Sequence, residues 1–341
     1  MKHLYNRVNK NELKDRVEKD HVLRLTISFY KYSRIDNVRV FRDHLYAVLS
    51  DIGVLGRIYV AHEGINAQIS VPNEHFEMLR NILDEITFLK GCRLNVAIDN
   101  DGLSFYKLQI KVRDKIVADG IEDEKFDVSD NARHIDAIEF NRLSQDEDTI
   151  ILDMRNHYES EVGYFKGAIR PDVDTFRESL PIVEEILSEN QGKNVIMYCT
   201  GGIRCEKATA YFKYRGFENL HQLDGGIIEY TRQAQNKGLE NRFVGKNFVF
   251  DDRLGERISE DVVSKCHQCG EASDSHKNCA NDHCHVLFIQ CAKCAERYQN
   301  CCSGLCSDFM ALPEEERELA KDNLTFNGSK FGKGRYRSHR P

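Results

Sequence analysis

Alternating hydrophobic and polar positions predict that the first third of the chain forms short strands around two amphipathic helices. Residues 23–32 (LRLTISFYKY) alternate and are rich in β-branched and aromatic side chains, which is typical of a half-buried strand. Apolar residues recur at helical spacing in 38–53 and 73–86. Further strands are predicted at GRIYVAHE (56–63), GINAQISV (64–71), LNVAIDN (94–100) and SFYKLQIKV (104–112). The order βαββαβ predicts an α+β domain of the ferredoxin-like type.

The middle of the chain alternates buried strands with helices. TIILDMR (149–155) and NVIMYC (194–199) are short apolar strands, and helical patterns follow in 178–190 and 205–217. This alternation predicts a parallel α/β sheet, which binds ligands at the carboxyl ends of its strands. Cys199 stands at such an end.

Length and composition favour a soluble protein of two or three domains, with 341 residues, 41% hydrophobic and 30% charged. No apolar run approaches the roughly 18 residues of a membrane span, and residues 1–20 lack the apolar core of a signal peptide. We therefore expect a cytoplasmic protein with no membrane partner. In that reducing compartment, twelve cysteines favour catalysis or metal binding over disulfides.

The net charge of −7 argues against broad binding to nucleic acid, and no DNA partner is expected. The last thirteen residues differ, because 329–341 contain five cations and no acid: Lys330, Lys333, Arg335, Arg337 and Arg340. This tail is either a solvated end or an arm that contacts phosphates.

The loop CTGGIRC (199–205) has the features of a reactive site. Two glycines let the backbone turn tightly between a buried strand and a helix, so successive N–H groups form a nest for an anion. Such a nest lowers the pKa of a central cysteine, and Arg204 adds a positive charge. Cys199 is the predicted nucleophile, although a buried structural cysteine is the alternative. Cys205 either resolves a disulfide with Cys199 or packs under the helix.

Nine of the twelve cysteines lie between positions 266 and 306. Two C-x-x-C pairs about twenty residues apart predict a four-thiolate zinc site of structural role, formed by Cys266, Cys269, Cys291 and Cys294. A second site is predicted from Cys279, Cys284, Cys302 and Cys306, with Cys301, His283 or His285 as alternative ligands. An iron–sulfur cluster, or cysteines without metal, remain alternatives.

The segments DMR (153–155), YESEVGYFKGAI (158–169), CTGGIRC (199–205) and LDGG (223–226) resemble a rhodanese homology domain. Similar domains carry sulfur as a cysteine persulfide or, with a longer loop, act as phosphatases. The phosphatase signature places five residues between cysteine and arginine, whereas four separate Cys199 from Arg204. The spacing therefore argues against a phosphatase.

With AHEGINA (61–67), CTGGIRCEKA (199–208) and CHQCG…CHVLFIQCAKC, the whole chain resembles the bacterial tRNA uridine(34) hydroxylase family. The resemblance implies oxidoreductase activity: molecular oxygen as co-substrate, tRNA as partner, and wobble uridine 34 converted to 5-hydroxyuridine. It also implies that Cys199 is essential.

In this interpretation Cys199 and Arg204 are catalytic, and the loop residues Thr200, Gly201, Gly202 and Ile203 bind substrate. The thiolate would add to C6 of uracil, after which C5 reacts with oxygen; prior oxidation of Cys199 to a sulfenic acid is the other route. A rhodanese-type sulfurtransferase and a noncatalytic scaffold are the alternative functions. The predicted domains are 1–126 (ferredoxin-like), 127–240 (rhodanese) and 241–341 (cysteine-rich, with the basic tail).

Overall fold

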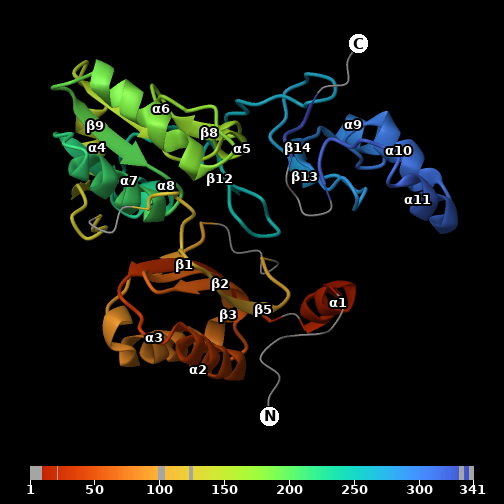
Figure 1. Ribbon diagram of the computed structural model, residues 1–341, viewed down its shortest axis with the longest axis horizontal. Coiled ribbons are helices and arrows are strands. Elements are labelled where there is room, and N and C mark those ends of the chain that lie inside the picture. Colours follow the sequence, from red (N-terminus) through yellow and green to blue (C-terminus); the bar gives the residue numbers. More distant parts are fainter. Residues whose placement is uncertain (1–9, 21, 99–103, 123–125, 330–333, 338–341) are drawn as a thin grey trace. The chain divides into compact units, whose positions relative to one another are not determined.

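The computed structural model of the chain describes residues 10–20, 22–98, 104–122, 126–329 and 334–337. The chain divides into two compact units, and Figure 1 labels their helices and strands. Unit 1 contains residues 1–155, 167–241 and 249–256, and unit 2 contains 156–166, 242–248 and 257–341.

The N-terminal part of unit 1 is a five-stranded sheet in the order β4-β1-β3-β2-β5. Strand β3 pairs antiparallel with β1 and β2, β1 pairs antiparallel with β4, and β5 joins β2 in parallel. The strands are β1 (Arg24–Tyr32), β2 (Leu55–Ala61), β3 (Gly64–Pro72), β4 (Asn95–Val96) and β5 (Leu108–Val112). The helices are α1 (Lys10–Asp20), α2 (Val38–Asp51) and α3 (Phe76–Glu85), with 3₁₀ turns at Asn73–His75 and Thr87–Leu89. The predicted ferredoxin-like α+β fold is confirmed, with β5 as an added edge strand.

The two faces of this sheet differ in character, because side chains alternate along a strand. Ile27 and Phe29 of β1 belong to the hydrophobic core that the sheet shares with α2 and α3. Ser28, Tyr30 and Tyr32 therefore point to the other face. β4 contains two residues of the predicted strand 94–100, both paired with β1, and residues 99 and 100 of that prediction lie outside the described residues.

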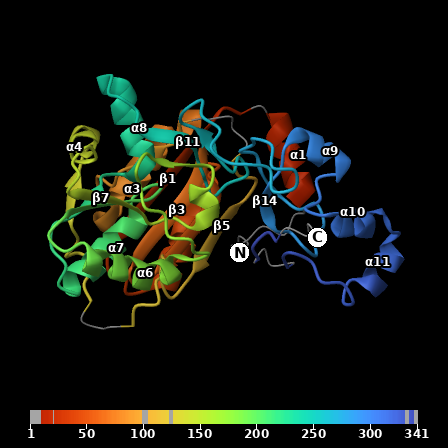
Figure 2. The same ribbon diagram turned by 90° about the horizontal axis from the view of Figure 1, so that it is seen from above.

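The rhodanese-like part of unit 1 is a parallel sheet in the order β6-β10-β9-β7. Its strands are β6 (Arg133–Ile135), β7 (Thr149–Asp153), β9 (Asn194–Tyr198) and β10 (Leu220–Leu223). Its helices are α4 (Ala137–Leu143), α6 (Phe176–Glu189), α7 (Ile203–Tyr214) and α8 (Gly226–Lys237). Helices α6 and α7 contact each other, as do α4 and α8, and the two pairs lie apart in Figure 2. The predicted parallel α/β domain is confirmed. Helix α7 begins at Ile203, two residues before the predicted start.

Unit 2 contains mostly short elements. Strand β8 (Gly163–Phe165) pairs antiparallel with β11 (Phe243–Asn247), and β13 (His276–Asn278) pairs antiparallel with β14 (Leu287–Ile289). The remaining elements are α5 (His157–Ser160), α9 (Ala292–Arg297), α10 (Gly304–Ala311) and α11 (Glu314–Ala320), and the short strand β12 (Glu256–Arg257) lies at the boundary between the two units. Cysteine side chains make up much of the buried core here, as expected for a cysteine-rich segment.

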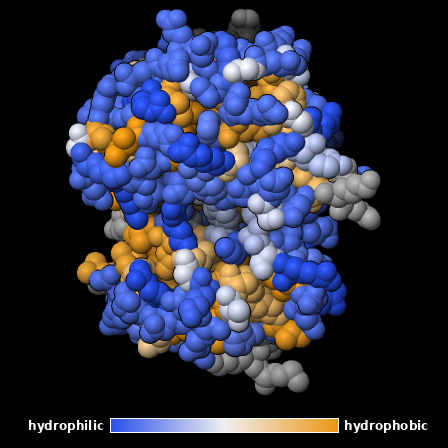
Figure 3. Space-filling model, turned by 90° about the vertical axis from the view of Figure 1, so that its left-hand side faces the viewer, coloured by the Kyte–Doolittle hydropathy of each residue, from blue (hydrophilic) through white to orange (hydrophobic). Residues whose placement is uncertain are grey.

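Within the described ranges, no helix has the length and apolar character needed to cross a bilayer. On the face drawn in Figure 3, hydrophilic side chains predominate and hydrophobic ones form patches between them.

Candidate active site and metal centres

Cys199 lies where the sequence predicted, directly after β9 at the carboxyl end of a parallel strand. It is wholly buried, and the Gly202 N–H donates a hydrogen bond to its Sγ at 3.1 Å. Gly202 has φ of +104° and precedes α7, so the backbone turns here in a conformation that side chains disfavour. The predicted nest is thus formed around the sulfur.

The surroundings of Cys199 favour its thiolate. Burial raises the pKa of this thiol, but a hydrogen bond from Cys205, the charge of Arg204 and the backbone N–H groups of Arg204 and Gly202 outweigh burial and lower the pKa to about 6. Burial and the adjacent Cys199 sulfur raise the pKa of Cys205 well above its usual value. At neutral pH the loop therefore combines one thiolate with one thiol donor.

The four loop residues Thr200, Gly201, Gly202 and Ile203 adjoin the thiolate, as their positions require. Gly226, from the LDGG motif, supports the loop from the other side. The Ile227 N–H donates to the Cys199 carbonyl at 3.1 Å, and a Cβ on Gly226 would collide with that carbonyl oxygen. This contact explains why a glycine stands at 226.

The polar face of β1 runs along the loop. A Cβ added to Gly202 would lie 2.7 Å from the Tyr30 hydroxyl, and the Tyr32 hydroxyl donates to the Ile203 carbonyl at 3.2 Å. The nearest atoms to a Cβ on Gly201 belong to β4 and β1 residues, Asn95 and Ser28. Side chains of β1 and β4 therefore border the loop that contains Cys199.

A polar network continues from Tyr30. Its hydroxyl donates to Glu206 at 3.0 Å, and His134 lies 3.5 Å from Glu206 and 3.2 Å from Asp224. Hydrogen bonds to Asp224 and Glu206 raise the pKa of His134 to about 9, so His134 is cationic at neutral pH. Arg93 pairs with Asp224 at 2.6 Å.

A buried ion cluster lies one residue further along α7. Lys207 is 1% exposed, and its Nζ contacts Glu63 at 2.7 Å and Asp119 at 2.5 Å. The carboxylate of Glu63 also accepts a hydrogen bond from the Ile116 N–H. Glu63, in the turn of AHEGINA, thus anchors α7 to the N-terminal sheet through its ion pair with Lys207.

Sequence analysis missed Tyr30, Asn95, Glu206 and Lys207. The alternation of β1 offered a signal, because Ser28, Tyr30 and Tyr32 form a polar face that α2 and α3 leave uncovered. The alternation did not indicate which residues that polar face would contact.

The eight predicted metal ligands assemble into the two predicted groups. In each group the four sulfur atoms lie within 4.8 Å of one another: Cys266, Cys269, Cys291 and Cys294 in one, and Cys279, Cys284, Cys302 and Cys306 in the other. None of the cysteines forms a disulfide, and each group could hold a metal ion.

Backbone and amide N–H groups point at the second group. The Cys302 N–H donates to Cys279 Sγ at 3.3 Å, and Asn281 and Asn327 donate to the Cys306 and Cys302 sulfurs, each at 3.5 Å. Such donors stabilise thiolates, the form in which cysteine binds metal. The alternative ligands Cys301, His283 and His285 are in neither group.

A parallel sheet with a cysteine thiolate in a nest at a strand's carboxyl end defines a rhodanese-domain protein. Known domain families match three segments: the UPF0176 acylphosphatase like domain at 24–116, the rhodanese-like domain at 136–233 and the rhodanase C-terminal family at 244–307. A solved rhodanese-related protein from Thermoplasma volcanium, 22% identical, covers 33% of this chain and 97% of its own with a TM-score of 0.25, too low to support an argument.

Full-length relatives are more informative. The chain is 52% identical over 336 residues to the tRNA uridine(34) hydroxylase of Photorhabdus laumondii, covering 98% of this chain and 95% of that one. It is also 52% identical to the tRNA uridine(34) hydroxylase of Cronobacter sakazakii, with 98% and 96% covered. The chain belongs to the tRNA uridine(34) hydroxylase family.

Proposed function

We propose that this protein hydroxylates uridine 34 of tRNA to 5-hydroxyuridine with molecular oxygen, in the cytoplasm, and that Cys199 is the nucleophile. The observation that carries the proposal is the match, at about half identity and over nearly the whole chain, to proteins named for that reaction. The lowered pKa of Cys199 supports it, because the reaction needs a thiolate at neutral pH.

The thiolate adds to C6 of uracil, and the electron pair of the C5–C6 double bond moves to C5 and O4 as an enolate. Arg204 and the nest N–H groups supply positive charge beside the reacting sulfur. C5 then bonds to dioxygen and, after protonation, carries a hydroperoxide. Only one of the two oxygen atoms stays in the product, so two electrons are still needed.

Cys205 is placed to supply these electrons, since it is a thiol in hydrogen-bond contact with Cys199. Its sulfur takes the outer oxygen as a sulfenic acid and leaves a hydroxyl on C5. Loss of the C5 proton expels Cys199 from C6 and restores the double bond. Cys199 then attacks the sulfenic acid, giving a disulfide and water, and an external thiol reductant resets the pair. Uridine, oxygen and two thiols thus yield 5-hydroxyuridine, water and a disulfide.

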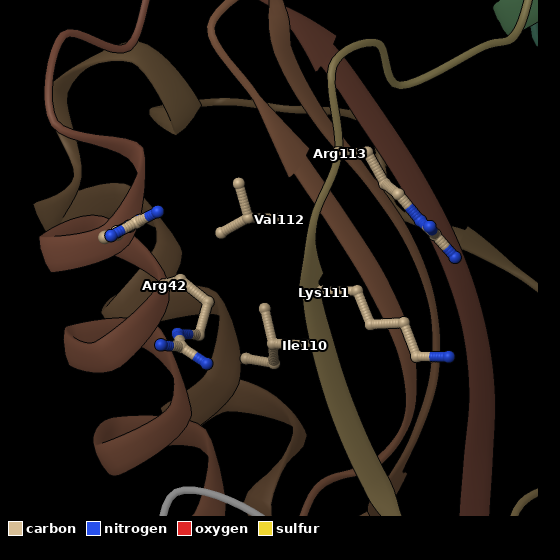
Figure 4. A pocket seen from close by; sticks show the side chains of 6 residues that line it. Arg42, Ile110, Lys111, Val112 and Arg113 are labelled. Atoms are coloured by element: carbon tan, nitrogen blue, oxygen red, sulfur yellow. The ribbon is translucent and has the colours of Figure 1, made fainter.

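A basic groove in the N-terminal sheet suits a tRNA backbone. It has a volume of about 450 Å³ and is lined by Arg39 and Arg42 of α2 and by residues 110–113. Figure 4 shows Ile110 and Val112 of edge strand β5 turned toward α2, with Lys111 and Arg113 on the other side of the strand. Cations on both sides of a strand can follow a run of phosphates, and they supply local positive charge in a chain of net charge −7.

Zinc is the metal we propose for both cysteine groups. Tetrahedral coordination at a Zn–S distance of about 2.3 Å separates neighbouring sulfurs by about 3.8 Å. The sulfurs of Cys284 and Cys302 are 3.6 Å apart, and those of Cys302 and Cys306 are 3.8 Å apart. Four thiolates leave no open position, so the metal's role is structural.

The boundaries 1–126, 127–240 and 241–341 remain our proposal for the domains.

The rhodanese-like loop favours one second candidate, a sulfurtransferase that carries a persulfide on Cys199. Nucleoside mass spectrometry separates the two functions. We expect tRNA from cells without the gene to lack 5-hydroxyuridine, and the purified protein with oxygen and a thiol to restore it. Thiosulfate-to-cyanide transfer without any 5-hydroxyuridine would support the sulfurtransferase instead.

A further inference from the structure

Asn95 has a buried acceptor without a donor. The residue is 4% exposed, and its Oδ1 accepts no hydrogen bond from any residue in the described part of the chain. Leaving such an atom unpaired destabilises the folded protein. A group of this kind in a folded protein requires an explanation, and one explanation is a ligand that supplies the missing donor.

The position of Asn95 points to the active-site loop. Asn95 stands opposite Ser28 in the antiparallel pair of β4 and β1, so the two side chains share a face of the sheet. A Cβ on Gly201 would lie 3.7 Å from Asn95 Nδ2 and 4.0 Å from Ser28 Oγ. This spacing is ordinary contact, whereas the equivalent position on Gly202 is crowded by Tyr30 at 2.7 Å. The less crowded side of the loop is therefore bordered by an amide and a hydroxyl.

A second unpaired polar atom lies in the same loop. The Oγ1 of Thr200 is buried and has no hydrogen-bond partner among the described residues. Thr200 directly follows Cys199. An amide acceptor on the strand that borders the loop and a hydroxyl within the loop thus both lack partners among the described residues.

We propose that Asn95 reads the Watson–Crick edge of the target uracil, a role that rests on the proposed function. That edge presents one donor, N3–H, between two acceptors, O2 and O4. The Asn95 amide is complementary, because Oδ1 accepts from N3–H while Nδ2 donates to a flanking carbonyl. Thr200 donates from its hydroxyl to the remaining carbonyl. A base without N3–H leaves Oδ1 unpaired and is rejected.

Binding without oxygen tests this role independently of hydroxylation. Two anticodon stem-loops are compared, one with uridine and one with N3-methyluridine at position 34. We expect the wild-type protein to bind the uridine stem-loop at least tenfold more tightly, and Asn95→Ala to bind the two within about threefold of each other. Tenfold corresponds to about 1.4 kcal/mol in binding free energy.

Val96→Ala is the matched control, because Val96 is the neighbouring β4 residue and packs against the N-terminal core instead. This variant should keep the preference for uridine. Asn95→Asp, nearly the same size, retains an acceptor for N3–H and should keep part of the preference. Asn95→Ala should melt no lower than the wild type, since it removes an unpaired acceptor, whereas a purely structural asparagine would lower the melting temperature.

Equal binding of both stem-loops by the wild-type protein, or no binding of either, overturns the role of Asn95. An unchanged preference in Asn95→Ala overturns it as well. A clear preference that depends on Asn95, in a protein that never forms 5-hydroxyuridine, would retain the base-reading site and refute the hydroxylase instead.

Discussion

Lys207 Nζ lies 2.7 Å from Glu63 and 2.5 Å from Asp119, so one ammonium, almost wholly buried, neutralises two carboxylates. Lys207 belongs to α7, the helix that begins in the reactive loop, whereas Glu63 lies in the turn between β2 and β3. The ion cluster thereby fixes α7, the helix that follows Cys199, to the N-terminal sheet.

Replacing this lysine should be costly. Lys207→Met leaves two carboxylates without their cation, and breaking a buried pair typically costs about 3–5 kcal/mol in the free energy of unfolding. Denaturant unfolding measures the loss. Lys213→Met is the control on the same helix, because Lys213 pairs with an exposed Asp130 and should cost less than about 1 kcal/mol. Equal losses in the two variants would contradict the structural role of Lys207.

Replacement of Cys199, the proposed nucleophile, should abolish the reaction without unfolding the protein. Cys199→Ser changes the side-chain volume little, but a serine hydroxyl is barely ionised at neutral pH. We expect more than a hundredfold less 5-hydroxyuridine per minute by nucleoside mass spectrometry, with unchanged circular dichroism. Cys92→Ser, distant in sequence from the loop, should remain active. A Cys199→Ser protein that retains most of its activity would refute the assignment.

Alkylation of Cys199 should report its lowered pKa. Because the thiolate is the reactive form, the rate should fall as the pH drops through about 6 and should change little between pH 7 and 9. Mass spectrometry of the peptide that contains Cys199 measures the rate. Arg204→Met removes a nearby positive charge and should move the midpoint to higher pH. A wild-type midpoint near the ordinary thiol value would show that the nest does not stabilise the thiolate.

The purified protein should contain between one and two zinc ions per chain. Chelation should unfold unit 2, because a segment with so many buried cysteines depends on metal for its stability. Cys284→Ser should reduce the metal content of the purified protein, whereas the control Cys92→Ser should not, and this difference would assign the lost metal to the second group. Less than about half an equivalent of any metal, after purification without chelators, would count against both sites.

Binding of tRNA should depend on the groove and on the basic tail. Each lost phosphate contact flattens the slope of log affinity against log salt by about 0.7 on single-stranded RNA. Removing residues 329–341 and, separately, replacing Arg39 and Lys111 by alanine should each weaken binding and flatten the slope, while Cys199 stays equally reactive. Three of the tail's five cations, Lys330, Lys333 and Arg340, lie outside the described residues. Unchanged affinity and slope after truncation would identify the tail as a solvated end.

The sequence predicted local features far better than long-range ones. The strand–loop–helix around Cys199 follows from apolar runs and two glycines, and the C-x-x-C spacing predicts that the cysteines of each pair lie close together. Contacts between segments far apart in the chain carry no such pattern. No residue near Glu63 in the sequence indicates that Glu63 pairs with Lys207, which is 144 residues away. Asn95 is a single polar residue in a short edge strand, and nothing in its sequence marks it as different from other polar residues.

The alternation of side chains along β1 matters for experiments that insert residues into the chain or truncate it. Ser28, Tyr30 and Tyr32 meet the consecutive loop residues Gly201, Gly202 and Ile203, so a single inserted residue would turn Ile27 or Phe29 toward the thiolate. An isolated rhodanese fragment would also lack Glu63 and Asp119, the partners of the buried Lys207. Inactivity of such a fragment would therefore be no evidence about Cys199, and a transplant of the loop into another rhodanese needs β1 and β4 with it.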